Sequence, residues 1–175
     1  MKKRSALRAE TRLAPLFSSA KDDWETPDDF FQQLNDEFCF TLDAAANERN
    51  HKVPLWFGPG SPLGVEDALT ADWRVDRFTT AWLNPPYGRS IERWVEKAFR
   101  EALQGRATVV CLLPARTDTA WWHRYVMRAS QVRFIRGRLR FVGAATSAPF
   151  PSVIVVFWRH NVPGTPEFRT QELRG

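Results

Sequence analysis

The 175-residue sequence has few of the residues from which metal sites and disulfide frameworks are built. It contains two cysteines and three histidines, and Cys39 and Cys111 have no metal-ligand spacing. Both cysteines lie in apolar runs, so we expect core thiols in a reducing cytoplasm. No apolar run approaches the roughly 20 residues of a membrane span, and the basic N-terminus lacks the apolar stretch of a signal peptide. The sequence therefore predicts a cytoplasmic protein without a bound metal and without a membrane partner.

Acidic residues are almost missing from one part of the chain. Residues 106–159 contain nine arginines and a single acid, Asp118, whereas residues 14–105 contain sixteen acidic and nine basic residues. A basic half beside an acidic half favours a polyanionic partner. The alternative is an arginine-rich solvated face with no ligand.

The length suits one domain. Residues 1–20 show no clean periodicity and are predicted to form a flexible basic arm. We expect the folded domain to span residues 21–160 and a C-terminal tail to follow at 161–175.

Helical and strand patterns alternate along the chain. Thr26 can cap a helix over 26–38, with Pro27 at its first position, and a second helix is clear over 90–105. The remaining predicted elements are strands at 38–42, 79–84, 107–114, 132–141 and 151–158 and a helix at 117–129, with an irregular segment at 47–76. This order predicts an α/β fold with a mostly parallel sheet and an antiparallel C-terminal edge. Ligands bind beyond the carboxyl ends of such strands, where Asp43, Asn84 and Arg116 are expected.

The strand that ends at Leu83 is followed by Asn84, Pro85, Pro86 and Tyr87. The prolines remove two backbone donors and fix two φ angles, and a residue before proline is held in extended geometry. The turn can thus direct main-chain carbonyls outward, next to the side-chain oxygen of Asn84 and the flat ring of Tyr87. Two acceptors beside an aromatic face are complementary to a planar group that bears an NH₂. Adenine, cytosine and a carboxamide all meet this description.

Such an arrangement favours methyl transfer to the amine. Two acceptors that draw on both hydrogens favour a pyramidal nitrogen and return its lone pair, so that an activated methyl placed in line can be attacked directly. The protein contributes orientation and preorganised dipoles and needs no strong base. A base inside a duplex must be flipped out to reach the turn, with Tyr87 as its stacking surface. The structural alternative is a proline-rich turn followed by a helix cap at Ser90.

Other motifs accompany this turn in a fixed order: WETP (24–27), TLDAAA (41–46), EDALTADW (66–73), LLPARTDTAWWH (112–123), GRLRF (137–141) and PSVIVVFW (151–158). With WLNPPYG (82–88), they show that the chain resembles the phage-type DNA N6-adenine methyltransferases, the small Dam-like family. The resemblance implies a trimmed Rossmann-like fold, S-adenosyl-L-methionine as methyl donor and adenine in DNA as acceptor. It implies catalytic roles for Asn84, Pro85, Pro86 and Tyr87, and donor binding by Trp24, Thr26, Pro27, Asp43, Ala44, Ala45 and Asp67.

Three features depart from the common pattern of S-adenosylmethionine-dependent methyltransferases. The turn at residues 43–47 contains no glycine, so alanines must permit the close approach to the donor. Only 41 positions separate Asp43 from Asn84, too few for two full strand–helix units, so we expect a sheet trimmed on that side. No separate target-recognition domain is apparent, so sequence choice must come from loops or termini. Asp72 is as good a candidate as Asp67 for the donor's adenine or ribose, and Asp43 could instead cap a turn.

Arginines crowd the segment that contains Arg133, Arg136, Arg138 and Arg140. Because Arg138 and Arg140 alternate with apolar residues, we expect both to leave one face of a strand. With Arg116 beyond a sheet tip, they are assigned to DNA, mostly to phosphates. The alternative is an edge strand protected by charge.

Two other functions fit parts of this pattern. A carboxamide also fits the turn, so methylation of a protein glutamine is possible in chemical terms. A DNA-binding module that kept the fold and lost donor binding would account for the missing glycines. The arginine-rich half and the accompanying motifs favour adenine methylation in DNA over both.

Overall fold

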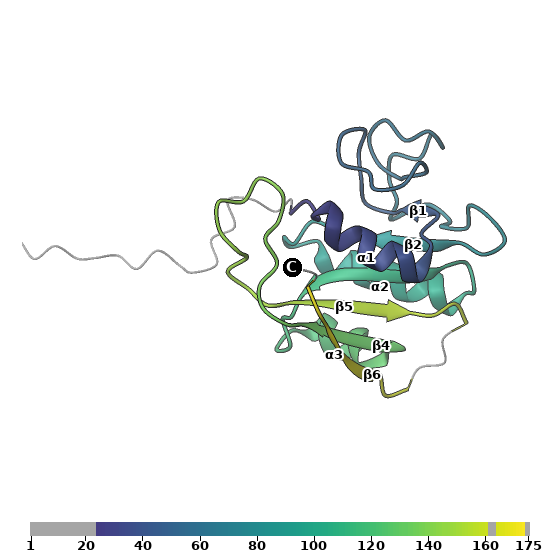
Figure 1. The fold of residues 1–175 in the computed structure, drawn as a ribbon. Coiled ribbons are helices and arrows are strands. Elements are labelled where there is room, and N and C mark those ends of the chain that lie inside the picture. Colours follow the sequence, from purple (N-terminus) through teal and green to yellow (C-terminus); the bar gives the residue numbers. More distant parts are fainter. Residues whose placement is uncertain (1–23, 161–163, 174–175) are drawn as a thin grey trace, which may run out of the picture.

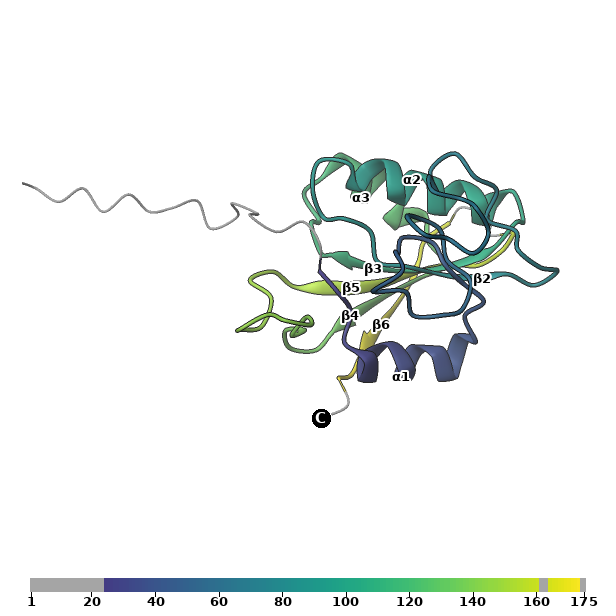
Figure 2. The same ribbon diagram turned by 90° about the horizontal axis from the view of Figure 1, so that it is seen from above.

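The computed structural model of the protein describes residues 24–160 and 164–173 (Figure 1). The predicted arm at residues 1–20 lies outside this range. The described elements are α1 (Asp28–Phe38), β1 (Leu42–Asp43), β2 (Thr80–Leu83), α2 (Ile91–Leu103), β3 (Thr108–Pro114), α3 (Ala120–Arg124), the 3₁₀ helix η1 (Val126–Arg128), β4 (Gln131–Ile135), β5 (Ser152–Phe157) and β6 (Glu167–Gln171). Helix α1 covers one face of the sheet, and α2 and α3 cover the other, which gives three layers (Figure 2).

The strands form one sheet in the order β1-β2-β3-β5-β4-β6. Strands β1, β2 and β3 pair in parallel, and so do β4 and β6. Strand β5 runs antiparallel to both its neighbours, β3 and β4. The expected α/β fold with a mostly parallel sheet and an antiparallel C-terminal strand is confirmed, but β5 is inserted within the sheet instead of lying at its edge. No helix separates β4 from β5, and a return without a crossover helix gives antiparallel pairing.

The edge of the sheet is formed by β6, which lies in the stretch expected to be a tail. It pairs with β4 from Gln131↔Glu167 to Ile135↔Gln171. Four of its five residues are exposed, so the strand has no apolar run to reveal it in the sequence. Part of residues 161–175 therefore belongs to the sheet.

Helix α1 begins one residue later than its expected first position. Pro27 is the residue before the helix, in extended geometry with φ −60° and ψ 140°, and its carbonyl accepts the N–H of Phe31 at 2.9 Å. Thr26 is not the helix cap, because its side chain is turned toward Asn84. The expected apolar face is present, with Phe30, Phe31, Leu34 and Phe38 buried.

Two further expectations differ from the structure. The predicted helix at 117–129 divides into α3 and η1, and the predicted strand at 132–141 ends at Ile135. Cys111 is a buried thiol in β3, as expected, but Cys39 is exposed and has a φ of +52° directly after α1. Its position at the helix end, in left-handed geometry, places its side chain outside the core.

The core lies between the helices and the central strands. Strand β5 is buried along its whole length and β3 from its second residue on, as continuous apolar strands covered on both faces must be. Among the described residues, no helix is both long enough and apolar enough to cross a membrane.

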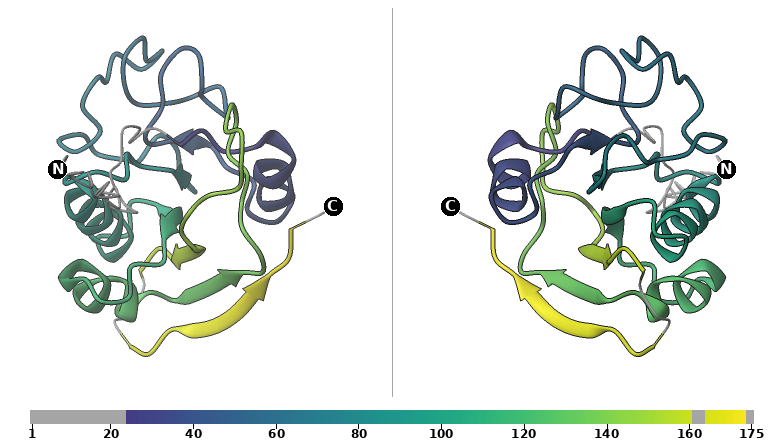
Figure 3. Two further views of the ribbon diagram at one scale, coloured as in Figure 1. Left: turned by 90° about the vertical axis from the view of Figure 1, so that its left-hand side faces the viewer. Right: turned by 90° about the vertical axis from the view of Figure 1, so that its right-hand side faces the viewer.

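Two long segments without regular structure border the carboxyl ends of the strands. One is the irregular segment 47–76 after β1, and the other is the β4–β5 loop, residues 136–151. Figure 3 shows the β4–β5 loop rising from the sheet past the start of α1. The N–H of Val142 donates to the carbonyl of Glu25 at 2.9 Å, which ties the two together.

Candidate active site

A cleft of about 390 Å³ opens beyond the carboxyl ends of β1 and β2. Its walls come from the segment before α1, the irregular segment 47–76, the Asn84 turn and the tip of the β4–β5 loop. Eight of the residues assigned to a site from the sequence line it: Trp24, Thr26, Asp43, Ala45, Asp67, Asn84, Pro85 and Pro86. Pro27, Ala44 and Tyr87 adjoin these residues in the chain but do not line the cleft.

The side-chain amide of Asn84 has one satisfied end and one unsatisfied end. Its Nδ2 donates to the main-chain carbonyl of Trp24 and, at 3.0 Å, to Oγ1 of Thr26. Its Oδ1 is buried and has no hydrogen-bond partner within the described part of the chain. A buried acceptor in a cleft wall is suited to a ligand that brings a donor.

Tyr87 lies beneath the turn and not in the cleft wall. Its side chain is 2% exposed, and its hydroxyl donates to the carbonyl of Leu112 at 3.1 Å. The rings of Phe141 and Phe150 meet it edge-on at centroid distances of 6.2 and 5.7 Å. Burial raises the pKa of Tyr87 well above its ordinary value. The open stacking face expected from the sequence is therefore covered in this structure.

Asp43 ends β1 and is 3% exposed. Its carboxylate accepts the N–H of Ala45 at 3.3 Å and the N–H of Lys52 at 3.0 Å, so it organises the turn that follows the strand. Burial raises the pKa of Asp43 to about 6, in spite of these two hydrogen bonds and the nearby Lys52 charge. The group is thus ionised at neutral pH and close to titration just below it.

A glycine from another part of the chain lies against the turn that follows β1. Residues 55–57 run beside β1, with Asp43 N–H donating to Leu55 O and Phe57 N–H donating to Asp43 O, both at 2.9 Å. Gly58 follows with a φ of +130°, and a Cβ there would lie 1.9 Å from the carbonyl oxygen of Ala46. Only glycine permits this close approach. The expectation that alanines permit the close approach to the donor stays a prediction.

The two aspartates that the sequence could not separate lie in different places. Asp67 lines the cleft and accepts the N–H of Leu69 at 2.9 Å. Asp72 is outside the cleft. Its Oδ1 accepts the N–H of Arg74 at 2.9 Å, and its Oδ2 forms an ion pair with Arg106 Nε at 3.4 Å. The geometry therefore favours Asp67 as the residue available to a ligand.

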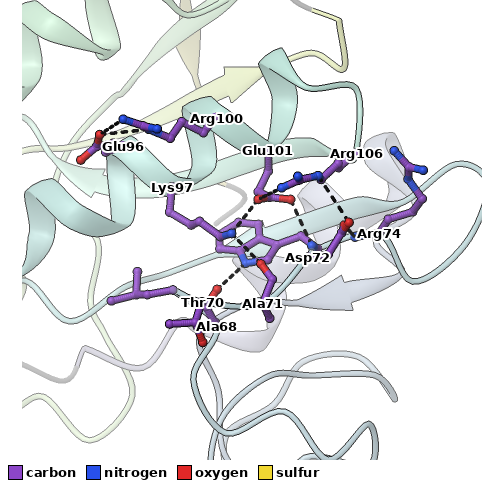
Figure 4. A network of polar contacts seen from close by, with 12 residues as sticks. Ala68, Thr70, Ala71, Asp72, Arg74, Glu96, Lys97, Arg100, Glu101 and Arg106 are labelled. Carbon is purple, nitrogen blue, oxygen red and sulfur yellow. Dashed lines mark hydrogen bonds and ion pairs between the residues drawn. The ribbon is translucent and has the colours of Figure 1, made fainter.

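The segment that carries Asp67 is held against α2 by a buried carboxylate. Glu101 is 1% exposed and accepts the N–H of Trp73 at 3.0 Å, Lys97 Nζ at 2.6 Å and Arg106 Nη1 at 2.9 Å (Figure 4). The Trp73 indole N–H in turn donates to the carbonyl of Ala68 at 2.8 Å, and Ala68 lines the cleft. We call these contacts the Glu101 network. It connects α2 to the wall of the cleft.

Arg138 and Arg140 lie in the β4–β5 loop and not on a strand, which corrects the expected element. Both are exposed, while Leu139 and Phe141 between and beyond them are buried at 3% and 2% exposure. The predicted alternation therefore survives in a loop that packs over Trp24 and Tyr87. Neither arginine lines the cleft, and the same is true of Arg116, which follows β3 and is half-buried.

Arg133 is a structural residue, contrary to its grouping with the DNA-contacting arginines. Its side chain is 5% exposed and makes two hydrogen bonds to Glu37 of α1, at 2.6 and 2.7 Å. Its guanidinium carbon also lies over the ring of Phe38, 5.0 Å from the ring centroid. Arg133 lies in β4, whereas its partner Glu37 lies in α1, far away in the sequence. The residues around Arg133 therefore gave no sign of this partner.

Several lining residues were not identified from the sequence: Glu25, Ala46, Asn47, Asn50, Lys52, Phe57, Gly58, Pro59, Glu66, Ala68, Trp82, Trp94 and Val142. The lining residues within 47–59 come soon after Asp43 in the sequence. This proximity is the one feature from which those residues could have been predicted. Among the described residues, no group of three or more His, Cys, Asp or Glu side chains is placed to hold a metal ion.

Residues 14–165 match the family described as DNA N-6-adenine-methyltransferase (Dam). A protein of Haemophilus phage HP1 (strain HP1c1) named DNA N-6-adenine-methyltransferase is 31% identical over 147 residues, 79% of this chain and 80% of that protein. A protein of the same name from Escherichia phage T1 is 29% identical over 122 residues, which is 69% of this chain and 48% of that protein.

Proposed function

Because the chain belongs to the DNA N-6-adenine-methyltransferase (Dam) family, we propose that it transfers a methyl group from S-adenosyl-L-methionine to the N6 amine of adenine in DNA. The observation that carries this proposal is the amide of Asn84, a residue of the cleft wall whose Oδ1 is a buried acceptor without a partner among the described residues. The adenine is flipped out of the duplex and its amine is held at the turn formed by Asn84, Pro85 and Pro86.

The turn acts on the amine through hydrogen-bond acceptors. Asn84 Oδ1 takes one hydrogen, and a main-chain carbonyl of the proline turn takes the other. Both acceptors favour a pyramidal nitrogen and direct its lone pair toward the donor site. The two prolines keep the turn from relaxing, so the dipoles are in place before the base arrives. The product proton can leave after attack, so the turn requires no strong base.

The charges in the cleft suit a cationic donor. Among the described residues, four carboxylates line it, from Glu25, Asp43, Glu66 and Asp67, against one cation, Lys52. S-adenosyl-L-methionine carries a sulfonium and an ammonium against one carboxylate, and when bound it supplies the electrophilic methyl group. In this proposal Asp43 pairs with the ammonium, and Asp67 accepts a hydrogen bond from the ribose or adenine. Because transfer removes the sulfonium charge, the same acidic lining holds the product less tightly than the donor.

Tyr87 takes part from beneath the turn. Its hydroxyl, bonded to the carbonyl of Leu112, anchors the turn to β3. A ring that is 2% exposed presents no free face, so stacking on a flipped base requires Phe141 and Phe150 to move with the β4–β5 loop. Movement of this loop on DNA binding is therefore part of the proposal.

The DNA surface is assigned to Arg116, Arg138 and Arg140, mostly as phosphate contacts. The β4–β5 loop contains three arginines and no acidic residue, and its Val142 reaches the cleft. A basic loop that touches both the cleft and the solvent is suited to the choice of target site. In this proposal the loop beside the cleft contributes to recognition of the target site.

The test is incubation with methyl-labelled donor and DNA of mixed sequence, followed by nucleoside analysis. We expect label in N6-methyladenine. Label only on cytosine would refute the proposal, and label only in protein would favour glutamine methylation instead. Donor binding measured by calorimetry separates a non-catalytic relative, which would bind DNA but not the donor.

Asn84→Ala provides the matched variant. It should abolish turnover, because the acceptor is lost, while donor affinity stays within about twofold of wild type. A parallel collapse of donor binding would show that Asn84 supports the cleft instead of the amine.

A further inference from the structure

The segment before α1 contacts the catalytic turn as well as the cleft. Asn84 Nδ2 reaches Trp24 O and Thr26 Oγ1, two acceptors that lie about sixty positions away in the sequence. An amide NH₂ has two hydrogens, and each has an acceptor here. The donor end of Asn84 is thus fully used within the protein.

These contacts fix which end of the Asn84 amide is left without a partner within the described residues. A main-chain carbonyl can only accept, so the atom of Asn84 that faces Trp24 must be the nitrogen. The other end is then Oδ1, which is buried and has no partner in the described residues. An amide free to turn over could present either a donor or an acceptor. Held in this way, Asn84 presents an acceptor alone.

Thr26 has little surface with which to touch a ligand. It lines the cleft but is 1% exposed, and its hydroxyl oxygen faces the Asn84 amide. Pro27 follows it in extended geometry, and α1 starts at the next residue, so the proline and the helix that follow restrict the backbone of Thr26. A rigidly placed hydroxyl is suited to hold a side chain in one orientation.

We propose that Thr26 is a positioning residue that, with the Trp24 carbonyl, holds Asn84 as an acceptor and thereby selects a target that bears an amine over one that bears an oxo group. The inference rests on the proposed function and assigns Thr26 a role other than donor binding. Hypoxanthine differs from adenine by an oxo group in place of the amine, so it offers Asn84 Oδ1 an acceptor where a donor is needed.

The experiment compares Thr26→Val, which keeps the shape and removes the hydroxyl, with Thr26→Ser, which keeps the hydroxyl. Turnover should fall about three- to tenfold in Thr26→Val, the effect of one neutral hydrogen bond, and stay within about twofold in Thr26→Ser. Donor affinity by calorimetry should be unchanged in both. An equal loss of donor affinity and turnover would overturn the proposal, because it would make Thr26 a donor contact.

The second readout is selectivity. Two DNAs compete for binding to the protein: the DNA that is methylated in the labelling experiment, and the same DNA with hypoxanthine at the target position. The ratio of the two affinities measures the preference for adenine. The preference of wild type for adenine should shrink in Thr26→Val, and an unchanged preference would refute the selective role.

A third readout does not depend on turnover. In protein labelled with ¹⁵N-asparagine, the side-chain NH₂ signals of Asn84 are identified by their loss in Asn84→Ala. They should shift and exchange faster in Thr26→Val than in wild type or Thr26→Ser. Unmoved signals would refute the contact.

Different results would refute the proposed function and the positioning role of Thr26. A wild-type protein that methylates no adenine refutes the proposed function. A wild-type protein that does so, with a folded Thr26→Val variant of full turnover, refutes only the positioning role.

Discussion

Removal of the Glu101 carboxylate should destabilise the protein far more than removal of a neighbouring exposed one. Glu101→Ala leaves the N–H of Trp73 without its acceptor and deprives Lys97 and Arg106 of their common partner. Breaking a buried charge pair in this way costs about 3–5 kcal/mol. The Arg106 side chain is 31% exposed and can turn to water, so we expect the lower end, about 3 kcal/mol.

Glu96→Ala is the matched control, because Glu96 lies on the same helix and pairs with Arg100 across one turn at the surface. Its loss should cost about 0.3–0.5 kcal/mol. In a domain of this size 1 kcal/mol corresponds to about 2–4 °C, so thermal melting should show a fall of roughly 6–12 °C for Glu101→Ala and of about 1–2 °C for the control. Equal shifts in the two variants would refute the assignment of Glu101 as the main polar anchor of this segment.

Three further predictions concern the cleft and the loop beside it. Burial raises the pKa of Asp43 to about 6, and the donor's ammonium requires the ionised form, so donor affinity measured by calorimetry should fall as pH drops below about 6. An Asp43→Asn variant should bind weakly at every pH, and a wild-type affinity that does not change between pH 5 and 8 would contradict the pairing. Gly58→Ala should prevent stable folding or sharply lower the melting temperature, whereas Gly64→Ala, at a φ of +68° but with nothing within 4 Å of its Cβ, should cost only about 1 kcal/mol; similar melting curves would show that the close approach at Gly58 is dispensable. Arg138→Ala and Arg140→Ala should each weaken DNA binding and reduce the slope of log affinity against log salt by about 0.9, and unchanged slopes would leave these residues without a phosphate contact.

Local patterns in the sequence were sufficient for the elements next to the catalytic turn. The apolar spacing of α2 and the continuous apolar run of β3 predicted both elements within two residues. The strand–turn–helix order around Asn84 placed it at the carboxyl end of β2. These features depend on periodicity and on proline geometry, which act within a few residues and need no knowledge of distant contacts.

The remaining features depend on contacts between distant residues. Arg133 and Arg138 look alike in the sequence, yet Glu37 buries the first, and the second lies in a loop in solvent. Thr26 stands at a position in the sequence that is typical of a helix cap, but its hydroxyl accepts a hydrogen bond from Asn84 instead of capping α1. Strand β6 forms because β4 has a free edge and not because its own residues are apolar.

The trimmed side of the sheet changes where the stability of the cleft comes from. In a full strand–helix unit, a wall of this kind is fixed by many backbone hydrogen bonds and an apolar helix face. Here the wall is the irregular segment 47–76. Phe57 and Trp73 are buried in the core, and the polar contacts of the segment include the bridge between Asp43 and Trp56, the Asp43 carboxylate on the N–H of Lys52, and the Glu101 network at its far end. Asp43 is therefore both an anchor of the wall and the proposed partner of the donor. Because a buried carboxylate with a raised pKa is costly to keep ionised, the ionised Asp43 lowers the stability of the fold at the position where the proposed pairing with the donor needs a charge. A bound cationic donor would offset that cost, so the donor should stabilise this wall more than any other part of the described chain.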